Sequence, residues 1–491
     1  MKALRIDWYP SYPHEKVSSI AKQLYSHLPV KSQGANKSDR EQKLFGVCLQ
    51  FISALYLNHH SINKASSVST YKSPKHFSSN KSDKSKINYP ARAFLEVHKA
   101  LLQLDWITET LGIKGKSLTL IEPASALKKM FDDIGFVWAK QPLKDDEDLL
   151  LMRDVKRDEK NKKIKFDVPL PDYDEKELHL KDLRKINSAL VNHCITLDLN
   201  DADLFRVNTR NKDDNNETDI IDKSLLITNV QLSRIFARGS VKHGGRFYRG
   251  WWQSLPSLHR PHIRINGYKT DEVDFNGIGI RILYAIKGMS YNEDDPYDIG
   301  LNGWQGKSDP RRKHVKKALN ALINDVDKGY KLDKHQISCL GMDTNEFKRL
   351  VNKKHEPIKE SFQSMAGLEA QYIDSQIAEQ VMLTLIDNDS IALPIHDSFI
   401  VRVGHKGLLL DAMEKACRDI IGVNISTTDE YIKNAEHFNL NKDSVLLQSN
   451  DIDNMIADLN ALKEVAINYP STIMDKYLVS FEGFKAKEST H

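Results

Sequence analysis

Hydrophobic residues recur every three or four positions in several parts of the chain, and this spacing predicts amphipathic helices. The clearest such stretches are residues 44–52, 91–107, 124–131, 183–191 and 371–383. Short β-prone runs predict strands at residues 118–121, 164–168 and 195–199. The pattern around residues 230–236 favours a further helix. Helices and strands are therefore both expected along the chain.

Residues 61–88 are rich in serine and lysine and almost without large apolar side chains, which is typical of a linker or surface loop. Around it we distinguish an N-terminal helical segment at 1–60, an accessory α/β region at 89–229, a larger region at 230–440 and a helical tail at 441–491. A helical module with a β wing, as predicted from residue 89 onwards, occurs in duplex-binding proteins and in purely structural modules. Both interpretations stay open.

Two β-prone runs each contain an aspartate, one at the end of its run and the other at a polar interruption of its run. Asp274 closes one run, just before a turn with two glycines and a helical pattern. Asp397 lies in the second, residues 393–401, which reads as a β-hairpin with a polar tip. A single aspartate of this kind is more often an ordinary turn residue. Two of them can share hard cations such as Mg²⁺, and that is the arrangement we expect here.

Between the two aspartates lies a strongly predicted basic helix. Asp309 is a good N-cap residue, and Pro310 suits the first helical position. One polar face consists of residues spaced by four, namely Arg312, Lys316, Asn320 and Asn324. An arginine and a lysine one turn apart can bind a polyphosphate, and an ordinary solvated face has the same pattern.

Residues 244–253 interleave arginines with aromatic residues and glycines. Arginine neutralises phosphates and aromatic rings stack on bases, so this pattern favours contact with nucleic acid. An equally weighted alternative is a buried aromatic strand with arginines that reach solvent. The candidate contact residues are Arg246, Tyr248, Arg249 and Trp252, together with His396 at the hairpin tip.

The composition narrows the class of protein but not its activity. The chain has 491 residues, 40% of them hydrophobic, and a net charge of +4, so a basic surface for nucleic acid has to be local. Four scattered cysteines include no Cys-x-x-Cys pair, which argues against a disulfide framework or a zinc site and favours a reducing compartment. Neither a signal-peptide core nor an apolar run of membrane-spanning length is evident. We therefore expect a cytoplasmic protein without a membrane partner.

The order of strand aspartate, basic helix and His-Asp hairpin resembles the palm and fingers of family A DNA polymerases and of single-subunit, phage-type RNA polymerases. Residues 274–281 are similar to the first palm motif, whose aspartate binds both metal ions. Arg312 and Lys316 match the fingers motif that grips the incoming triphosphate, and His396-Asp397 matches the last palm motif. The resemblance covers residues 230–440. It departs from the family where Asn324-Asp325 stands in place of a Tyr-Gly pair, and the fingers are short.

This resemblance implies an α+β, right-hand polymerase with an antiparallel palm sheet, reduced helical fingers and a mixed N-terminal accessory region. It implies a nucleotidyltransferase that uses two Mg²⁺ ions, with Mn²⁺ as a substitute, a nucleic acid template or primer and nucleoside triphosphates. Asp274, Asp397 and Lys316 would be catalytic, with the metal ions on the two aspartates.

The resemblance also bears on the choice of sugar. Gly279 and Asn324 would form the sugar gate, because family DNA polymerases usually carry a glutamate at the position of Gly279. Glycine there, and the sequence Ser398-Phe399, are more similar to the RNA polymerases. RNA synthesis or priming is therefore favoured. A DNA polymerase of the same superfamily, a catalytically silent nucleic-acid-binding replication or defence protein, and a two-metal nuclease are the alternatives.

Overall fold

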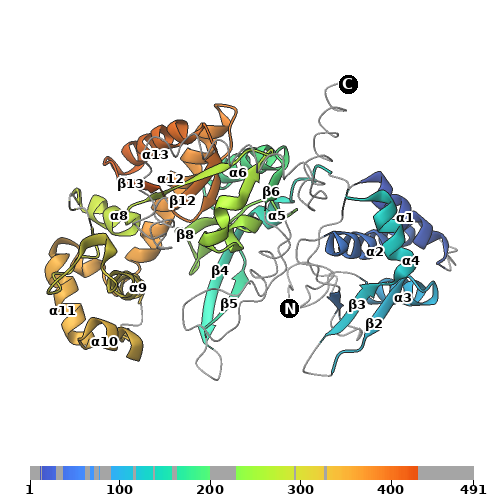
Figure 1. Ribbon diagram of the computed structural model, residues 1–491, viewed down its shortest axis with the longest axis horizontal. Coiled ribbons are helices and arrows are strands. Elements are labelled where there is room, and N and C mark those ends of the chain that lie inside the picture. Colours follow the sequence, from blue (N-terminus) through green and yellow to red (C-terminus); the bar gives the residue numbers. More distant parts are fainter. Residues whose placement is uncertain are drawn as a thin grey trace, which may run out of the picture.

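The computed structural model describes residues 12, 14–28, 37–60, 67–70, 77, 90–113, 118–136, 139–157, 163–198, 228–291, 293, 295–325 and 329–429. It is a mixed α and β structure with several small sheets, arranged as a smaller N-terminal lobe and a larger lobe (Figure 1). In these residues, every helix is too short or too polar to cross a membrane. The predicted tail at 441–491 and the polar loop at 208–218 lie outside the described residues.

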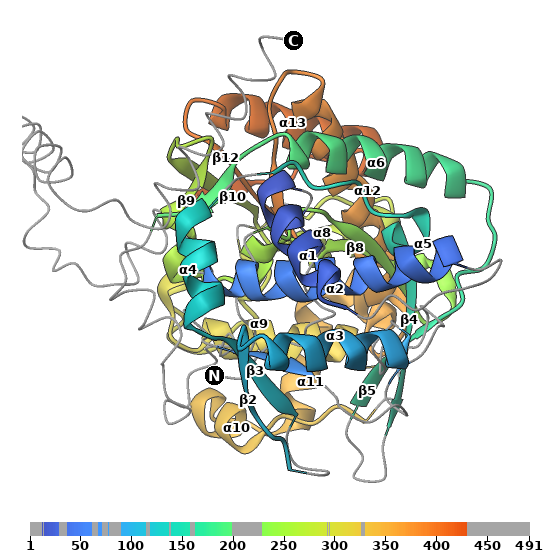
Figure 2. The same ribbon diagram turned by 90° about the vertical axis from the view of Figure 1, so that its right-hand side faces the viewer.

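The N-terminal lobe packs four helices around a three-stranded antiparallel sheet of order β1-β3-β2 (Figure 2). Its elements are α1 (Glu15–Ser26), α2 (Lys37–His59), β1 (Val68–Thr70), α3 (Ala91–Gln103), β2 (Ile107–Thr110), β3 (Thr119–Pro123) and α4 (Ser125–Ile134). Buried Phe94, Val97 and Leu101 lie three and four residues apart on α3, which confirms the helix expected there as far as Gln103. The predicted end at residue 107 is wrong, because Ile107 begins β2. Strand β1 corrects the interpretation of residues 61–88 as a linker throughout, because its three residues are buried against β3.

A four-stranded sheet of order β5-β4-β7-β8 begins the larger lobe. It consists of β4 (Leu150–Arg157), which follows the short α5 (Asp146–Leu149), β5 (Lys163–Val168), β7 (Ser233–Ala237) and β8 (Ser240–Tyr248). Strand β7 corrects the helix predicted around residues 230–236. It is buried and paired on both sides, in parallel with β4 and antiparallel with β8. The sheet therefore crosses the boundary drawn at residue 230, and the regions 89–229 and 230–440 share one sheet.

A second four-stranded sheet, of order β11-β12-β10-β13, is antiparallel throughout. Its strands are β10 (Thr270–Phe275), β11 (Leu393–Ile395), β12 (Ser398–Arg402) and β13 (Thr427–Asp429). The structure thus confirms the strand at Asp274 and the hairpin around Asp397. Helices α12 (Ala366–Ile386) and α13 (Lys406–Ile421) pack against this sheet, α8 (Ile278–Ile286) packs against both of them, and α12 also lies along β8 (Figure 1). Side chains such as Val273, Phe275 and Phe399 fill the core between them.

Three helices form a separate group next to this sheet, at the lower left of Figure 1. They are α9 (Arg312–Ile323), α10 (Lys334–Leu340) and α11 (Thr344–Lys354), with short 3-10 turns at η5 (Gly306–Ser308) and η6 (Glu356–Ser361). Helix α9 is the predicted basic helix, but it begins at Arg312 and not at Pro310. The Asp309 carboxylate accepts a hydrogen bond from the backbone N–H of Arg311 (2.8 Å), so it orders the turn before the helix.

The remaining elements join the two sheets. Helix α6 (Lys176–Val191) contains the helix predicted at 183–191, and β6 (Ile195–Leu197) pairs with β9 (Ile263–Ile265). Two 3-10 helices, η3 (Trp251–Ser254) and η4 (Ser257–His262), carry the chain from β8 to β9. Together they bring the strand of Asp274 alongside the end of β8.

Candidate active site

Asp274 and Asp397 lie on neighbouring strands of the antiparallel sheet. Asp274 on β10 pairs with Ser398 on β12, and Asp397 is the residue just before Ser398. The backbone N–H of Phe275 donates to the carbonyl oxygen of Asp397 (3.3 Å), which joins the two segments directly. The hairpin turn that carries Asp397 is His396-Asp397 itself, because Ile395 pairs with Ser398. The fold therefore brings together two carboxylates that are far apart in sequence.

Tyr297 is the side chain that relates these carboxylates to the basic helix. Its pKa is raised chiefly by burial, and the negative charges of Asp397 and Asp274 raise it further, while Arg312 opposes them. The Arg312 guanidinium lies 4.9 Å from the centre of the Tyr297 ring, and the Lys316 ammonium lies 5.7 Å from it. The charges of both carboxylates thus act on the ring against which the cationic face of α9 lies. Tyr297 could not be identified from the sequence, because it lies in a loop without periodicity.

Arg312 and Lys316 differ in their ion-pair partners. Arg312 binds the buried carboxylate of Asp295 through two hydrogen bonds, of 2.8 Å and 3.0 Å. Lys316 is half-buried and, within the described ranges, forms no ion pair. Of these two side chains, Lys316 is therefore the one available to an anionic ligand, whereas Arg312 has to share or leave Asp295 to bind one.

Arg246 on β8 is bound to a buried carboxylate of α12. Its Nε donates to Asp374 Oδ2 at 2.6 Å. Burial raises the pKa of Asp374 to about 6, with Arg246 opposing that shift and Asp397 adding to it. The charge of Asp397 thus acts on this ion pair. Arg246 holds Asp374, and with it α12, against β8 beside the site. Asp374 could not be recognised from the sequence, because the position of a polar residue on a helix does not indicate which distant residue it contacts.

Tyr248 and His396 lie together at the edge of the site. Their ring centres are 5.6 Å apart in an edge-to-face arrangement, and His396 is exposed with a left-handed backbone (φ 58°). Partial desolvation and the nearby Arg246 lower the pKa of His396. Arg249 directly follows the end of β8; its guanidinium is 3.9 Å from Asp148, and burial lowers its pKa.

Trp252 does not have the role expected of it. Its side chain is fully buried, and its Nε1–H donates to the carbonyl oxygen of Pro394 in β11 (3.1 Å). A base cannot stack on a ring that the protein core covers on both faces. The expectation of nucleic-acid contact is therefore wrong for Trp252, which instead holds the hairpin of Asp397 in place.

Two glycines follow Asp274, and their environments are different. Gly277 adopts a left-handed conformation (φ 64°) as the N-cap of α8, and a Cβ there would lie 2.6 Å from Pro296 Cγ. Gly279 lies within α8, is exposed, and has no atom within 4 Å of the place where a Cβ would be. The turn therefore requires glycine at position 277. The backbone does not require glycine at position 279, where a side chain would enter open space.

Asn324, the second residue of the expected sugar gate, caps the end of α9. Its Nδ2 donates to the Asn320 carbonyl oxygen (2.8 Å), and its Oδ1 accepts from Gln371 Nε2 (3.4 Å). A Cβ on Gly367 would lie 2.5 Å from Asn324 Oδ1, so the side chain lies tightly against the start of α12. These contacts give Asn324 a clear role in joining α9 to α12.

A buried acidic residue supports the site from β10. Glu272 is completely buried, accepts a hydrogen bond from Ser398 Oγ (2.9 Å) and forms an ion pair with Arg260 of η4. This contact ties the residue after Asp397 to the strand of Asp274. It fixes the hairpin relative to β10 and leaves Glu272 engaged with protein groups.

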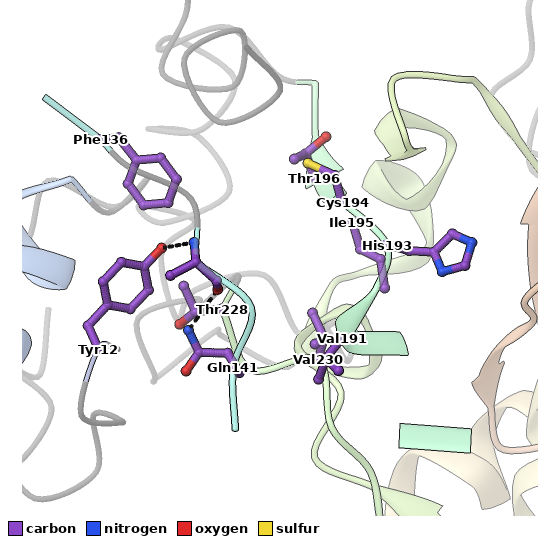
Figure 3. Close-up of a pocket in the computed structure, with 11 residues that line it drawn as sticks. Tyr12, Phe136, Gln141, Val191, His193, Cys194, Ile195, Thr196, Thr228 and Val230 are labelled. Atoms are coloured by element: carbon purple, nitrogen blue, oxygen red, sulfur yellow. Dashed lines mark hydrogen bonds between the residues drawn. The ribbon is translucent and has the colours of Figure 1, made fainter. Parts of the chain in front are cut away.

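A small cavity of about 30 Å³ lies elsewhere, at the junction of the two lobes (Figure 3). Tyr12 and Phe136 line it from one side, and Cys194, Ile195 and Val230 line it from the other. The Tyr12 hydroxyl accepts a hydrogen bond from the Ala139 N–H (3.1 Å) across its edge. A space of this size holds about one water molecule, so it is too small for a nucleotide.

The donor atoms around Asp274 and Asp397 fit a hard divalent cation. Carboxylate oxygens are the ligands that Mg²⁺ and Mn²⁺ prefer, and the negative charges of both carboxylates contribute to raising the pKa of Tyr297. No protein-family model matches the chain, and no curated protein matches it either. Functional inference therefore depends on the geometry of these residues.

Proposed function

We propose that this protein is a template-directed nucleic acid polymerase, a nucleotidyltransferase of the right-hand type. The single observation that supports it most is that Asp274 and Asp397, on paired strands, both act electrostatically on Tyr297, the ring against which Arg312 and Lys316 lie. The antiparallel sheet of β10–β13 corresponds in this proposal to the palm, and α9–α11 to reduced fingers. A nuclease would have no use for a cation such as Lys316 opposite the two carboxylates, so that alternative is weaker.

In this proposal Asp274 and Asp397 hold two Mg²⁺ ions, or Mn²⁺ in their place. When bound, such ions acidify a 3′-hydroxyl and neutralise the charge of a departing pyrophosphate. The ammonium of Lys316 binds the triphosphate of the incoming nucleotide as a point charge. Arg312, released from or shared with Asp295, adds a forked contact. Arg246 keeps Asp374 and the hairpin in register and does not itself contact the nucleotide.

The open space at Gly279 supports a ribonucleotide substrate. A residue at this point of the palm lies below the sugar in polymerases that this chain resembles, and a side chain there crowds a 2′-hydroxyl. Gly279 has no side chain, and the surroundings contain nothing within 4 Å that replaces one. RNA synthesis or priming is therefore the favoured reaction, and DNA synthesis is the second candidate.

One observation favours a second class of function. The guanidinium of Arg312 donates two hydrogen bonds to Asp295, as in a protein whose triphosphate grip is no longer used. A catalytically silent, nucleic-acid-binding replication or defence protein would keep the fold and the cationic face of α9 but incorporate no nucleotide.

One experiment separates these functions. Purified protein is incubated with labelled ribo- or deoxyribonucleoside triphosphates and Mg²⁺ or Mn²⁺, on primed and unprimed DNA and RNA templates. A polymerase extends or initiates a chain and loses this activity in Asp397→Asn but not in Asp411→Asn, an exposed aspartate on α13. Template binding without incorporation in every combination would favour the silent protein. Shortening of the template that depends on Asp397 would favour the nuclease.

A further inference from the structure

Three potential metal ligands gather on the helices α9 and α10, apart from the two aspartates. They are His314 on α9 and His335 and Cys339 on α10. One ligand atom from each lies within 4.8 Å of the other two. Among the residues that the structure describes, it is the only group of three or more His, Cys, Asp or Glu side chains whose potential ligand atoms lie this close together.

The local structure explains why these three side chains converge. His335 and Cys339 are four residues apart on α10, so they lie on one face of the helix. A capping box between Asp333 and Gln336 fixes the start of α10, and Gly341 ends it in a left-handed conformation (φ 69°). Helix α9 packs against α10 and brings the His314 ring to within 5.0 Å of the His335 ring. Two regular helices therefore set the geometry.

We propose that His314, His335 and Cys339 form a binding site for Zn²⁺. Imidazole nitrogen and thiolate sulfur are the ligands that zinc takes in tetrahedral sites. Bonds of about 2.1 Å to nitrogen and about 2.3 Å to sulfur place two tetrahedral ligands about 3.6 Å apart. Cys339 Sγ lies 3.7 Å from His335 Nδ1, close to that separation. Three protein ligands leave the fourth position for water or an added ligand.

The zinc site is distinct in position and chemistry from the proposed polymerase site. His314 lies two residues from both Arg312 and Lys316, so it projects from the other side of α9, roughly 200° around the helix. Its nitrogen and sulfur ligands favour zinc, whereas the oxygens of Asp274 and Asp397 favour Mg²⁺. Bound zinc would join α9 to α10 behind the cationic face. This inference holds whether or not the protein is a polymerase.

The charges around the cluster are mixed. Lys313 and Lys317 flank His314 on α9, and Asp333 begins α10. The carboxylate of Asp333 opposes the positive charge of these lysines at His314. All three ligands are at least partly exposed, which gives the ion a path from solvent.

Metal binding is measured on the full chain without an added histidine tag. After chelator treatment, the protein is titrated with Co²⁺, and the absorption is followed in the near ultraviolet and the visible. We expect one equivalent of Co²⁺ with a thiolate charge-transfer band and with the visible bands of a tetrahedral ion, followed by displacement with Zn²⁺. The melting temperature should also rise on addition of Zn²⁺.

The ligands are tested one at a time. Cys339→Ser should abolish the charge-transfer band, and His314→Asn should weaken Zn²⁺ binding at least about tenfold, the lower limit even for residues that only support a ligand. Ser338→Ala, next to Cys339 but on another side of α10, is the matched control and should bind like wild type. Metal-free melting temperatures verify that each variant folds.

Absence of stoichiometric binding by the wild-type protein would overturn the proposal. So would a charge-transfer band that persists in Cys339→Ser, or Zn²⁺ affinity that is unchanged in His314→Asn. Because nucleotide incorporation is not part of the readout, failure here leaves the proposed polymerase activity to its own experiment.

Discussion

The two four-stranded sheets of the larger lobe treat their charged residues in different ways. In the sheet of β4, β5, β7 and β8, arginines end on buried carboxylates of α12. Arg234 donates to both oxygens of Glu379 (2.8 and 2.9 Å), and Arg246 binds Asp374. In the antiparallel sheet, Asp397 forms no ion pair with any residue that the structure describes. The first sheet therefore pairs these arginines with buried carboxylates, whereas Asp397 of the second sheet has no ion-pair partner among the described residues.

This difference teaches how to interpret arginines between aromatic residues. The stretch from Arg246 to Trp252 has the composition of a nucleic-acid-binding segment, yet Arg246 is paired and Trp252 is buried. A buried pair of charges is costly to break, so it fixes α12 on β8. Asp397 and Lys316, which lack such partners in the described residues, are the better guides to function.

The largest effect should follow from Asp397→Asn. The substitution keeps the volume but removes a metal-binding charge, and incorporation should fall by about 10⁴-fold or more, as expected when a metal-assisted step is lost. Thermal melting and template binding should hardly change. Activity is measured as the initial rate of incorporation, with Asp411→Asn as the control. Wild-type activity in Asp397→Asn would remove this residue from the mechanism.

Arg234→Met tests the structural half of the comparison. Glu379 would remain buried without its partner, and the free energy of unfolding should fall by about 3–5 kcal/mol. Urea denaturation measures it. The matched control is Arg418→Met, whose exposed pair with Glu414 should contribute less than about 1 kcal/mol. Equal losses in the two variants would contradict the contrast between buried and exposed pairs.

The pH dependence of stability should reveal Asp374. Its pKa is about 6 in the folded protein and near 3.8 when unfolded, so the folded state holds the proton longer. Stability should therefore fall as the pH rises from about 4 to about 6, by up to about 3 kcal/mol, and no further above that range. Asp374→Asn should remove this slope, which denaturation at several pH values measures. The same slope in wild type and variant would show that another group causes it.

Lys316→Ala should weaken the use of nucleoside triphosphates. Loss of one charged contact corresponds to about a 10–100-fold rise in the KM for the nucleotide, with little change in template affinity. Lys353→Ala, an exposed lysine of α11, is the control. If template affinity falls and KM stays the same, then α9 binds nucleic acid and not the triphosphate.

Gly279→Glu should shift the choice of sugar. A carboxylate in the open space would exclude a 2′-hydroxyl and lower the ratio of ribo- to deoxyribonucleotide incorporation, by about 1–3 kcal/mol in discrimination. Gly277→Ala is the contrasting variant, because its side chain meets Pro296 and should lower total activity without changing the ratio. A constant ratio in Gly279→Glu would reject the sugar gate, and so would a wild-type enzyme that already prefers deoxyribonucleotides.

Local patterns in the sequence predicted the elements that carry the candidate residues. The β10 strand, the hairpin of Asp397, α9 and α12 each have a periodicity or a turn that a short window reveals. Strand β7 was misread because a short strand that is buried on both sides has no alternation of polar and apolar residues. The start of α9 was placed too early because Asp309 orders the preceding turn instead.

The partners of these elements could not be predicted in the same way. Tyr297, Asp295 and Asp374 reach the site only through the packing of segments distant in sequence. The absence of a Cys-x-x-Cys pair argued against a zinc site. That criterion does not detect the proposed site, because its ligands come from two helices and include only one cysteine. The fold class could be predicted as mixed α and β, while the contacts that define each site depend on tertiary structure.

The parallel pairing of β4 with β7 has a consequence for dividing the protein into fragments. A fragment that began at residue 230 would keep β7 but lose β4, and the backbone groups of one edge would be left without partners. Such an edge invites pairing with other chains and aggregation. Lys144 also reaches across the same boundary, where its backbone N–H donates to Gln231 Oε1 (2.9 Å). A fragment meant to fold independently therefore has to begin before Lys144, where the whole sheet is retained.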